Sequence, residues 1–339
     1  MKHSDLLLVA ELSANHNQEK NLALETLHAA KESGANAVKL QTYTADTLTL
    51  DSSKPYFQIQ SDTLWDGETL YSLYQKAYTP WEWHEELFEC AKKLGLLCFS
   101  TPFDPTAVDF LETLGNPIYK IASFEINDIP LIRYAARLQK PMILSTGIAS
   151  LEEISEAVEA CRNEGNEDIT LLACTSSYPA PLEEANLARI PDLKRRFGVK
   201  VGLSDHTLGF IAPVVAVSLG ASVIEKHFIL SRSLGGPDGA FSLEPSEFKE
   251  MVSHIHDASL ALGKANYEPS PKVAKSKIFK RSLFVCENIQ KGERFTPKNL
   301  RSIRPSHGLP PKHLSEILGK EAACDIERGE PLTWEMVRR

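Results

Sequence analysis

Residues 223–230, VIEKHFIL, place three adjacent polar side chains inside an otherwise apolar segment. A strand that is buried on both faces, as in a parallel sheet, normally consists almost entirely of apolar residues. A buried polar group is costly unless a partner satisfies it. Glu225 and Lys226 could simply neutralise each other where the strand ends. The alternative interpretation is that the strand ends here and presents its last side chains to a functional site.

His227 in this segment has a counterpart in His206, which follows another apolar segment. Two imidazoles on neighbouring strands can share one divalent ion, with water or a carboxylate completing its coordination. Buried histidines that are satisfied by hydrogen bonds are the alternative. Glu11 ends the first apolar segment, and a carboxylate beside a metal and a substrate could act as a base or orient the substrate.

Two lysines near the ends of apolar segments, Lys39 and Lys120, suggest an anion site. Hydroxyl side chains occupy comparable positions on other segments: Thr101, Ser123, Ser145 and Ser204. Ammonium and hydroxyl groups bind phosphates and carboxylates through charge-assisted hydrogen bonds. A single lysine at a strand end is more often part of a salt bridge. Two lysines together with these hydroxyls favour a binding site for a phosphate or a carboxylate.

Eight short apolar segments precede these polar side chains and alternate with segments of helical spacing. The apolar segments are 6–11, 37–42, 96–101, 118–123, 142–147, 170–176, 200–206 and 222–228. Helix signals between them include a capping box at Ser150 and Glu153 and a terminal glycine, Gly34. Eight such repeats predict an α/β fold, a (β/α)8 TIM barrel. A doubly wound open sheet is the alternative, but no GxGxxG loop follows the first strand.

In a TIM barrel the catalytic groups lie at the carboxyl ends of the strands. All eight apolar segments end in polar residues. In chain order these are Glu11, Lys39, Gln41, Ser100, Thr101, Lys120, Ser123, Glu125, Ser145, Thr146, Thr175, Ser176, Tyr178, Ser204, His206, Glu225 and His227. A few polar strand ends would be expected in any protein. Their presence on every strand predicts one site at this end of the barrel.

Residues 43–80 form a long insertion after the second strand. Connections of this length in compact domains are usually functional or disordered. Its aromatic content argues against disorder. Its aromatic residues include Tyr56, Phe57, Trp65, Tyr71, Tyr74 and Tyr78. We expect the insertion either to cover the mouth of the barrel or to form a dimer contact.

The chain changes character after Gly263, where a Lys-, Pro- and Ser-rich segment predicts a linker. Beyond it, NIQKGERFT (288–296) and DIERGEPLT (325–333) share the pattern [ND]-I-x-[KR]-G-E-x-x-T. This repetition predicts a small β-rich domain with internal pseudo-symmetry, too short to hold a catalytic site alone. The predicted divisions are a barrel domain at 1–263, a linker at 264–280 and a small domain at 281–339.

Composition argues against several classes of partner. The net charge is -8 and no block of basic residues occurs, which disfavours nucleic acid. The six cysteines are scattered without a CxxC pair, which disfavours a zinc cluster or a disulfide framework. The most apolar long segment, 209–224, contains Pro213 and is too short to span a membrane. The N-terminal apolar run is too short for a signal peptide, so we expect a cytoplasmic protein.

Ordered motifs along the chain resemble the sialic acid synthase family. They are ELSANHN (11–17), VKLQTYT (38–44), FSTPFD (99–104), YKIASFE (119–125), ILSTG (143–147), CTSSYP (174–179), GLSDHT (202–207) and IEKHF (224–228). The C-terminal part is similar to the antifreeze-like (SAF) domain. Within the family, ELSANHN, TLW (63–65), TPWEWH (79–84), ASFE and CTSSYP are most similar to the branch that makes pseudaminic acid. N-acetylneuraminate synthases usually read EIGINH in the first motif and have Asn where this chain has Ser176.

This resemblance implies that phosphoenolpyruvate condenses with an N-acetylated amino sugar to give a nine-carbon 2-keto acid and phosphate. In the pseudaminate branch the sugar is 2,4-diacetamido-2,4,6-trideoxy-L-altrose. Legionaminate or N-acetylneuraminate synthase activity of the same family is the alternative. The resemblance also implies a divalent metal, usually Mn²⁺ with Mg²⁺ or Co²⁺ as alternatives, and a homodimer with exchanged C-terminal domains.

The resemblance further implies roles for individual residues. His206 and His227 match the family's metal ligands. The matches to phosphoenolpyruvate contacts are Lys39, Thr101, Lys120, Ser123, Ser145 and Ser204, with Ser176 in place of an Asn. The matches around the sugar and the reacting carbons are Glu11, Gln41, Glu125, Tyr178 and Asp238, of which Glu11 and Glu125 are the catalytic candidates. Arg304 matches the arginine that contacts the sugar's acetamido group in the partner subunit's barrel.

Two other function classes remain open at this stage. A Schiff-base aldolase would use Lys39 or Lys120 as its nucleophile, and borohydride with a keto acid would trap that lysine. A non-catalytic protein that binds carbohydrate through its C-terminal domain would leave the polar strand ends unexplained.

Overall fold

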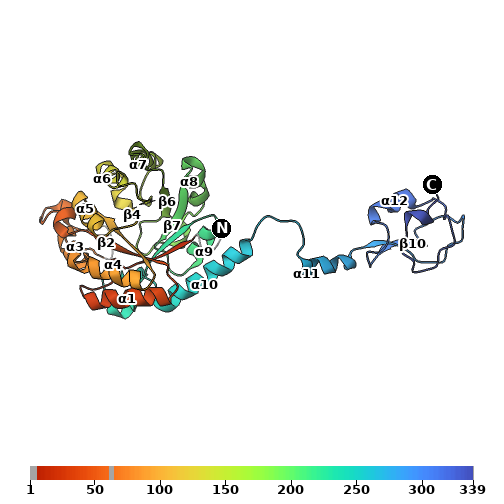
Figure 1. Cartoon of the computed structure of the whole chain (residues 1–339), viewed down its shortest axis with the longest axis horizontal. Helices are drawn as coiled ribbons and strands as arrows, with labels where there is room; N and C mark the ends of the chain where they lie inside the picture. The colour runs from red at the N-terminus through yellow and green to blue at the C-terminus, as the bar shows by residue number, and fades with distance from the viewer. Residues whose placement is uncertain (1–5, 61–64, 339) are drawn as a thin grey trace. The chain divides into compact units, whose positions relative to one another are not determined.

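The computed structural model describes residues 6–60 and 65–338. The chain divides into two compact units, Met1–Gly263 and Lys264–Arg339. In the first unit, eight parallel strands form a closed barrel in chain order (Figure 1). The strands are β1 (Leu7–Glu11), β2 (Ala37–Thr42), β3 (Leu97–Pro102), β4 (Tyr119–Ile121), β5 (Met142–Ser145), β6 (Ile169–Cys174), β7 (Lys200–Asp205) and β8 (Val223–His227). Each predicted apolar segment overlaps one strand, and the predicted TIM barrel is confirmed.

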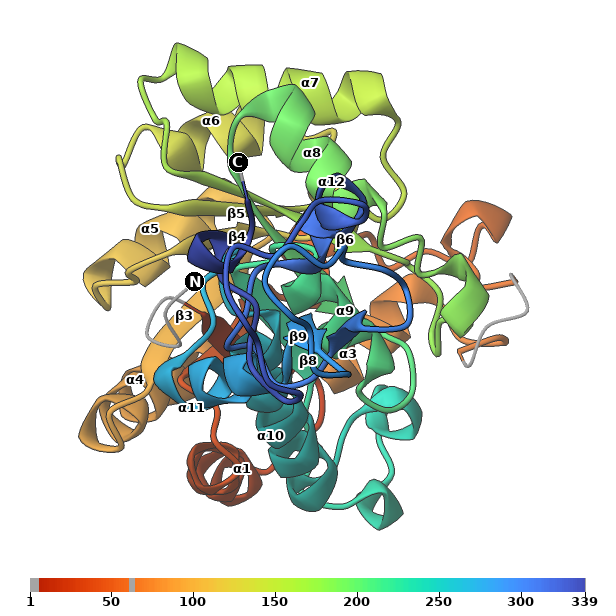
Figure 2. The same cartoon turned by 90° about the vertical axis from the view of Figure 1, so that its right-hand side faces the viewer.

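A ring of helices covers the outside of the barrel. The helices are α1 (Lys20–Glu32), α4 (His84–Lys93), α5 (Pro105–Thr113), α6 (Ile129–Ala136), α7 (Leu151–Asn163), α8 (Arg189–Phe197), α9 (Ile211–Ser218) and α10 (Pro245–Leu262). The first and the last of them, α1 and α10, pack side by side (Figures 1 and 2). The predicted capping box is present at the start of α7, where Ser150 and Glu153 each accept a hydrogen bond from the other's backbone N–H.

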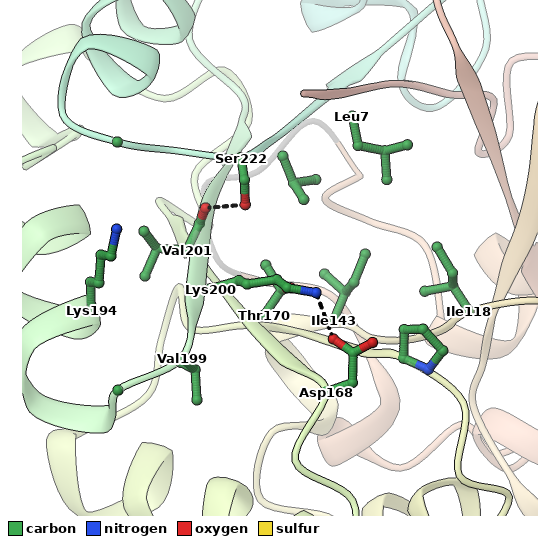
Figure 3. A pocket seen from close by; sticks show the side chains of 14 residues that line it. Leu7, Ile118, Ile143, Asp168, Thr170, Lys194, Val199, Lys200, Val201 and Ser222 are labelled. Atoms are coloured by element: carbon green, nitrogen blue, oxygen red, sulfur yellow. Dashed lines mark hydrogen bonds and ion pairs between the residues drawn. The ribbon is translucent and has the colours of Figure 1, made fainter. Parts of the chain in front are cut away.

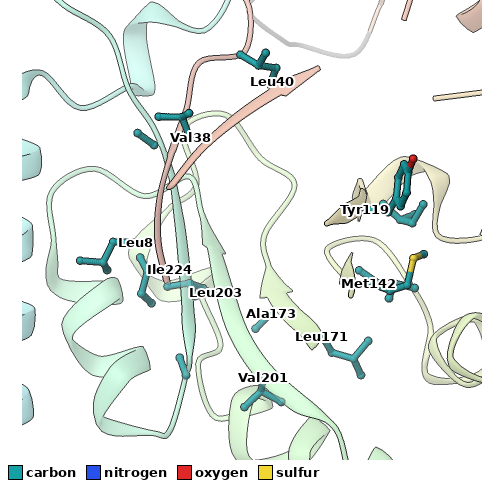
Figure 4. Packing of buried hydrophobic residues seen from close by; sticks show 14 of the residues in the cluster. Leu8, Val38, Leu40, Tyr119, Met142, Leu171, Ala173, Val201, Leu203 and Ile224 are labelled. Atoms are coloured by element: carbon teal, nitrogen blue, oxygen red, sulfur yellow. The ribbon is translucent and has the colours of Figure 1, made fainter. Parts of the chain in front are cut away.

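The strands bury apolar side chains on both faces. Outward-facing residues pack beneath the helices (Figure 4); they include Leu8, Val38, Leu40, Leu171, Leu203 and Ile224. Inward-facing residues form a separate apolar cluster: Val9, Ala37, Phe99, Ile143, Leu172 and Val223. Because side chains alternate along a strand, each inward apolar residue is followed two positions later by another inward side chain. On β8 the inward series is Val223, Glu225 and His227.

Strand β8 places Glu225 and Lys226 on opposite faces of the sheet. Glu225 lies inside the barrel. Lys226 lies outside it, where its Nζ donates to Asp205 Oδ2 at 2.5 Å and to the carbonyl oxygen of Thr207. The interpretation that Glu225 and Lys226 neutralise each other is therefore wrong, because neighbouring strand residues point in opposite directions. The strand does end at His227, as predicted.

The insertion after β2 contains two short helices among its described residues, α2 (Ala45–Leu48) and α3 (Leu70–Ala77). The ring of Tyr43, at its start, lies 5.7 Å from that of Tyr74 and 5.0 Å from that of Phe103. Residues 63 and 64 of the TLW motif lie outside the described residues. Of the helices in the described parts of the chain, none is long and apolar enough to cross a bilayer.

The second unit has its own small core and a two-stranded antiparallel sheet, β9 (Ser282–Val285) with β10 (Leu300–Ile303). Its two repeated segments pair with each other, because Ile289 and Ile326 exchange backbone hydrogen bonds at 2.9 and 2.8 Å. This pairing agrees with the predicted pseudo-symmetry. The unit also contains α11 (Pro271–Ala274) and α12 (Leu314–Ile317). The limits of the linker at 264–280 stay a prediction.

Candidate active site

A layer of buried, ion-paired side chains lies inside the carboxyl end of the barrel. Glu225 Oε1 accepts hydrogen bonds from Lys120 Nζ at 2.9 Å and from Ser204 Oγ at 3.1 Å. Lys39 Nζ lies 3.8 Å from the same oxygen. Because β4 and β8 stand on opposite sides of the closed barrel, the contact between Lys120 and Glu225 must pass through its interior.

Glu11 is the second carboxylate of this layer. Its Oε2 contacts Lys39 Nζ, and its Oε1 accepts a hydrogen bond from Gln41 Nε2 at 3.3 Å. Lys39 Nζ also donates to Thr101 Oγ1 at 3.3 Å. The structure therefore brings together two lysines, two carboxylates and two of the hydroxyls predicted for an anion site, those of Thr101 and Ser204.

The carboxylates at this end of the barrel have diverging pKa values. Burial alone would raise the pKa of Glu225, but Lys120 and Lys39 outweigh burial and lower that pKa to about 2. Burial raises the pKa of Glu11, and Lys39 offsets this effect only in part. Burial also raises the pKa of Glu125 to about 7. Such divergence separates a permanent anion, Glu225, from two groups able to carry protons, Glu11 and Glu125.

Two serine hydroxyls flank Gly147, which follows β5. Ser123 Oγ accepts a hydrogen bond from the Gly147 N–H at 3.1 Å. A Cβ atom at position 147 would lie 2.2 Å from Ser176 Oγ and 2.9 Å from Ser123 Oγ, so a larger residue here would displace these hydroxyls. Within residues 6–60 and 65–338, the buried hydroxyls of Ser145 and Ser176 have no hydrogen-bond partner. Buried hydroxyls normally have one, so these two are suited to bind a ligand.

The two predicted metal ligands face each other, with ring centroids 5.3 Å apart. His206 Nδ1 lies 2.9 Å from the carbonyl oxygen of Thr175, which places the ring proton on Nδ1 and the metal-binding lone pair on Nε2. His227 Nδ1 is buried, lacks a hydrogen-bond partner in the described part of the chain, and lies 3.8 Å from Asp238 Oδ2. Burial lowers the pKa of His227, so its ring is neutral, as metal binding requires.

Among the residues that the structure describes, no group of three or more His, Cys, Asp or Glu side chains has the geometry of a metal site. A metal held by the two histidines alone would take its remaining ligands from water or substrate. Open coordination positions distinguish catalytic from structural metal sites.

Aromatic side chains surround the imidazoles. The Tyr178 ring lies 4.4 Å from that of His206 and 5.1 Å from that of Phe241. Trp65, from the insertion, lies 5.8 Å from the Tyr178 ring and donates from Nε1 to the carbonyl oxygen of Pro237 at 3.2 Å. The insertion thus reaches the candidate site, which favours the predicted cover over the barrel mouth. A dimer contact through the insertion stays a prediction.

Sequence reasoning misses two residues that belong to this site. Ser13 Oγ lies between Gln41 Nε2 and the Asp238 carboxylate. Cys174 has its Sγ 3.9 Å from His206 Nδ1. Their membership of the motifs ELSANHN and CTSSYP is the signal that could have identified them. Among the predicted site residues, Arg304 belongs to the second unit, where it is exposed.

The opposite, amino end of the barrel contains a cavity of about 700 Å³. Its lining is largely apolar (Figure 3) and includes Leu7, Ile118, Ile143, Val199, Val201 and Val223. At its edge Lys200 Nζ donates to Asp168 Oδ1 at 2.8 Å, and Ser222 Oγ donates to the carbonyl oxygen of Val201 at 3.1 Å. As far as the described residues show, its lining includes none of the predicted site residues.

Comparisons with known proteins identify relatives over almost the whole chain. Residues 26–267 match the NeuB family and residues 280–338 match the SAF domain. The chain is 54% identical over 333 residues to the pseudaminic acid synthase of Helicobacter pylori, covering 98% of each chain. It is 40% identical over 328 residues to the N,N'-diacetyllegionaminic acid synthase of Campylobacter jejuni, covering 96% of this chain and 98% of the relative. Its structure is similar to that of the N-acetylneuraminic acid synthetase of Leptospira borgpetersenii, with a TM-score of 0.72, 32% identity, and 80% and 90% of the two chains covered.

Proposed function

The chain belongs to the NeuB family, and we propose that it condenses phosphoenolpyruvate with 2,4-diacetamido-2,4,6-trideoxy-L-altrose and water to give pseudaminic acid and phosphate. One observation supports this most directly. The carboxyl end of the barrel holds two lysines that suit an anion, two neighbouring imidazoles and two carboxyl groups whose pKa is raised. The identity of 54% to a pseudaminic acid synthase, against 40% to a legionaminic acid synthase, favours the altrose derivative over its stereoisomer.

Lys39 and Lys120 bind the phosphate and the carboxylate of phosphoenolpyruvate in this proposal. Glu225 stays ionised and lies within 3.8 Å of each ammonium group, so it offsets part of the cost of burying their charge. The surrounding hydroxyls of Thr101, Ser123, Ser145 and Ser176 complete the anion site as hydrogen-bond donors. Ser204 supports the site through Glu225, to which it donates its proton. Preorganised donors of this kind stabilise charge without further rearrangement.

His206 and His227 would hold a divalent ion, with Mn²⁺ as the first candidate and Mg²⁺ or Co²⁺ as alternatives. When bound, such an ion supplies Lewis acidity to the sugar's aldehyde oxygen and so favours attack on the carbonyl carbon. Gln41, Tyr178 and Asp238 are the residues that we expect to contact the sugar.

The reaction begins when C3 of phosphoenolpyruvate attacks the aldehyde carbon and forms the new carbon–carbon bond. The aldehyde oxygen takes up a proton, which Glu11 can deliver because its pKa is raised. Water adds to the resulting cation at C2, and Glu125 accepts the water's proton, since a pKa of about 7 suits a general base near neutral pH. The C2–O bond to phosphate then breaks, the C2 hydroxyl becomes the keto group, and its proton leaves with the phosphate.

The proposal includes a cytoplasmic homodimer with exchanged C-terminal domains, in which Arg304 of one subunit contacts the sugar in its partner's barrel. Mixing subunits tests this exchange. An Arg304→Ala subunit and a His227→Ala subunit are each inactive alone, but a mixed dimer would contain one complete site. Recovery of activity after mixing is expected, and its absence would contradict the exchange.

A Schiff-base aldolase requires a neutral lysine. Lys39 contradicts this, because the carboxylates of Glu11 and Glu225 outweigh burial and raise its pKa. Burial lowers the pKa of Lys120, but its Nζ donates to the buried carboxylate of Glu225 at 2.9 Å. Borohydride treatment with a keto acid is therefore expected to leave Lys39 and Lys120 unlabelled, and labelling of Lys120 would support the aldolase.

The test of the proposed function is phosphate release from phosphoenolpyruvate with three sugars in parallel, each with Mn²⁺ or with EDTA. The sugars are the altrose derivative, the legionaminate precursor and N-acetylmannosamine. Metal-dependent release with the altrose derivative alone is expected. Release with a different sugar would assign the enzyme to another substrate of the same family. No release with any of the three sugars would refute the proposal.

A further inference from the structure

Ser13 follows β1 and links three polar groups of the candidate site. Its Oγ donates to Asp238 Oδ2 and accepts a hydrogen bond from Gln41 Nε2 at 2.9 Å. Its backbone N–H donates to Glu11 Oε1 at 3.0 Å. Ser13 is itself only 4% exposed, so these contacts are shielded from water.

The backbone of Ser13 adopts an unfavourable conformation. Its φ of 45° lies in the left-handed region, where a Cβ atom crowds the backbone and glycine is preferred. Strained residues of this kind persist where the surrounding structure holds them, and they are concentrated at functional sites. A glycine here would avoid the strain but would lack the hydroxyl. At this position serine therefore differs from the favoured glycine in supplying a hydroxyl group.

The single hydroxyl proton of Ser13 also determines how Gln41 is oriented. Because that proton goes to Asp238, the Ser13 oxygen can only accept from Gln41. The Gln41 amide nitrogen donates both to Ser13 Oγ and to Glu11 Oε1, at 2.9 and 3.3 Å. Its two N–H groups are then used, and its amide oxygen is left to accept a hydrogen bond from a ligand. Gln41 is half-buried, so a ligand in the barrel mouth can reach it.

We propose that Ser13 is a positioning residue for sugar recognition, whose hydroxyl fixes the side chains of Asp238 and Gln41 so that both present acceptors to the sugar's hydroxyl and acetamido N–H groups. This inference rests on the proposed function in one respect, namely that Asp238 and Gln41 face the sugar. Phosphoenolpyruvate binds to the two lysines, so its affinity does not depend on Ser13.

Two variants separate the hydroxyl from the strain. Ser13→Ala removes the hydroxyl and keeps the strained backbone, whereas Ser13→Gly removes the hydroxyl and relieves the strain. The KM for the altrose derivative is expected to rise about tenfold in both variants, the effect of one lost hydrogen bond in a binding site, with the KM for phosphoenolpyruvate unchanged. Ser13→Gly is expected to melt about 2–4 °C above Ser13→Ala.

Gln139 supplies a matched control, because its φ of 56° is also left-handed and it lies between α6 and β5. Gln139→Ala and Gln139→Gly are expected to leave both KM values unchanged. An unchanged sugar KM in both Ser13 variants would overturn the proposal. So would a KM that rises in Ser13→Ala but returns to normal in Ser13→Gly, because recognition would then follow the backbone.

Crystal structures of the two Ser13 variants keep this test separate from that of the proposed function. If the unaltered enzyme releases phosphate with none of the sugars, the proposed function fails, and the side-chain positions still decide the role of Ser13. Rotation of Asp238 and Gln41 in both variants supports the positioning role, and unchanged rotamers overturn it.

Discussion

The two ends of the barrel hold their charged side chains in different ways. At the carboxyl end, Glu11, Lys39, Lys120 and Glu225 are each at most 4% exposed. At the amino end, the side chains of Asp168 and Lys200 are 48% and 63% exposed and pair at the surface, beside an apolar cavity.

This difference indicates that the charged side chains of the carboxyl end are not explained by the stability of the fold. A surface ion pair costs little and contributes little. Buried ion pairs pay a large desolvation penalty, and apolar residues of similar size would often stabilise a fold more. Perturbed pKa values in such a layer indicate a functional site, whereas the amino end needs no explanation beyond packing.

The largest expected effect comes from removing an imidazole at the carboxyl end. His227→Ala is expected to lower phosphate release on the order of 1,000-fold, because a metal ligand is lost. Val223→Ala is the matched control, since Val223 faces inward on the same strand but lines the cavity at the amino end. It should keep activity within about threefold while lowering stability by roughly 1–2 kcal/mol, the cost of truncating a buried apolar side chain. Full activity of His227→Ala in metal-depleted buffer would contradict a metal site at the carboxyl end of the barrel.

Glu225→Gln is expected to lower the free energy of unfolding by about 3 kcal/mol, because it leaves Lys120 buried beside a neutral partner. Chemical denaturation at neutral pH measures this loss. The pKa of Glu225 is lowered on folding, so its stabilisation is present above pH 4.5 and disappears as the pH falls toward about 2. A variant as stable as the unaltered protein would show that the buried layer is not held by charge.

Glu125 is expected to set the pH dependence of catalysis. As the base, it must be ionised, so kcat/KM should rise with pH through about 7 and level off above it. Glu125→Gln should lower kcat about 100-fold and abolish this rise. Folding raises the pKa of Glu125 from 4.5 to about 7. The unaltered protein should therefore lose stability relative to Glu125→Gln as the pH rises from 4.5 to about 7. A pH profile that the variant shares with the unaltered enzyme would assign the titration to another group.

The smallest effect is expected at the amino end. Asp168→Asn breaks the exposed pair with Lys200 and should change the free energy of unfolding by less than about 1 kcal/mol, with activity unchanged. A loss of stability as large as that of Glu225→Gln would remove the distinction between the two ends.

The sequence predicts the barrel and most of its polar end, because both follow from local patterns. Apolar segments mark the strands, capping residues mark the helices, and the parallel-strand rule sends every strand end to one side. VIEKHF illustrates the limit of this reasoning. Its pattern locates His227 at a strand end, but the partner of Glu225 is Lys120, on the opposite side of the barrel, and no local pattern encodes a contact across a closed sheet.

The contacts that sequence reasoning misses are those that join distant parts of the chain. Lys226 faces outward because of the register of β8, and its partner Asp205 is on β7. Ser13 lies in a turn, and Asp238, which it contacts, is 225 residues away. Trp65 reaches Tyr178 from an insertion that has no regular pattern. Each of these contacts requires the closed barrel before it can be recognised.

A crystal structure of the protein with phosphoenolpyruvate and Mn²⁺ tests the central claim most directly, because it places the ligand at one end of the barrel or the other. We expect the phosphate and the carboxylate on Lys39 and Lys120, with the metal ion on His206 and His227. Phosphoenolpyruvate in the cavity at the amino end, or a carboxyl end that stays empty at saturating ligand, would contradict it.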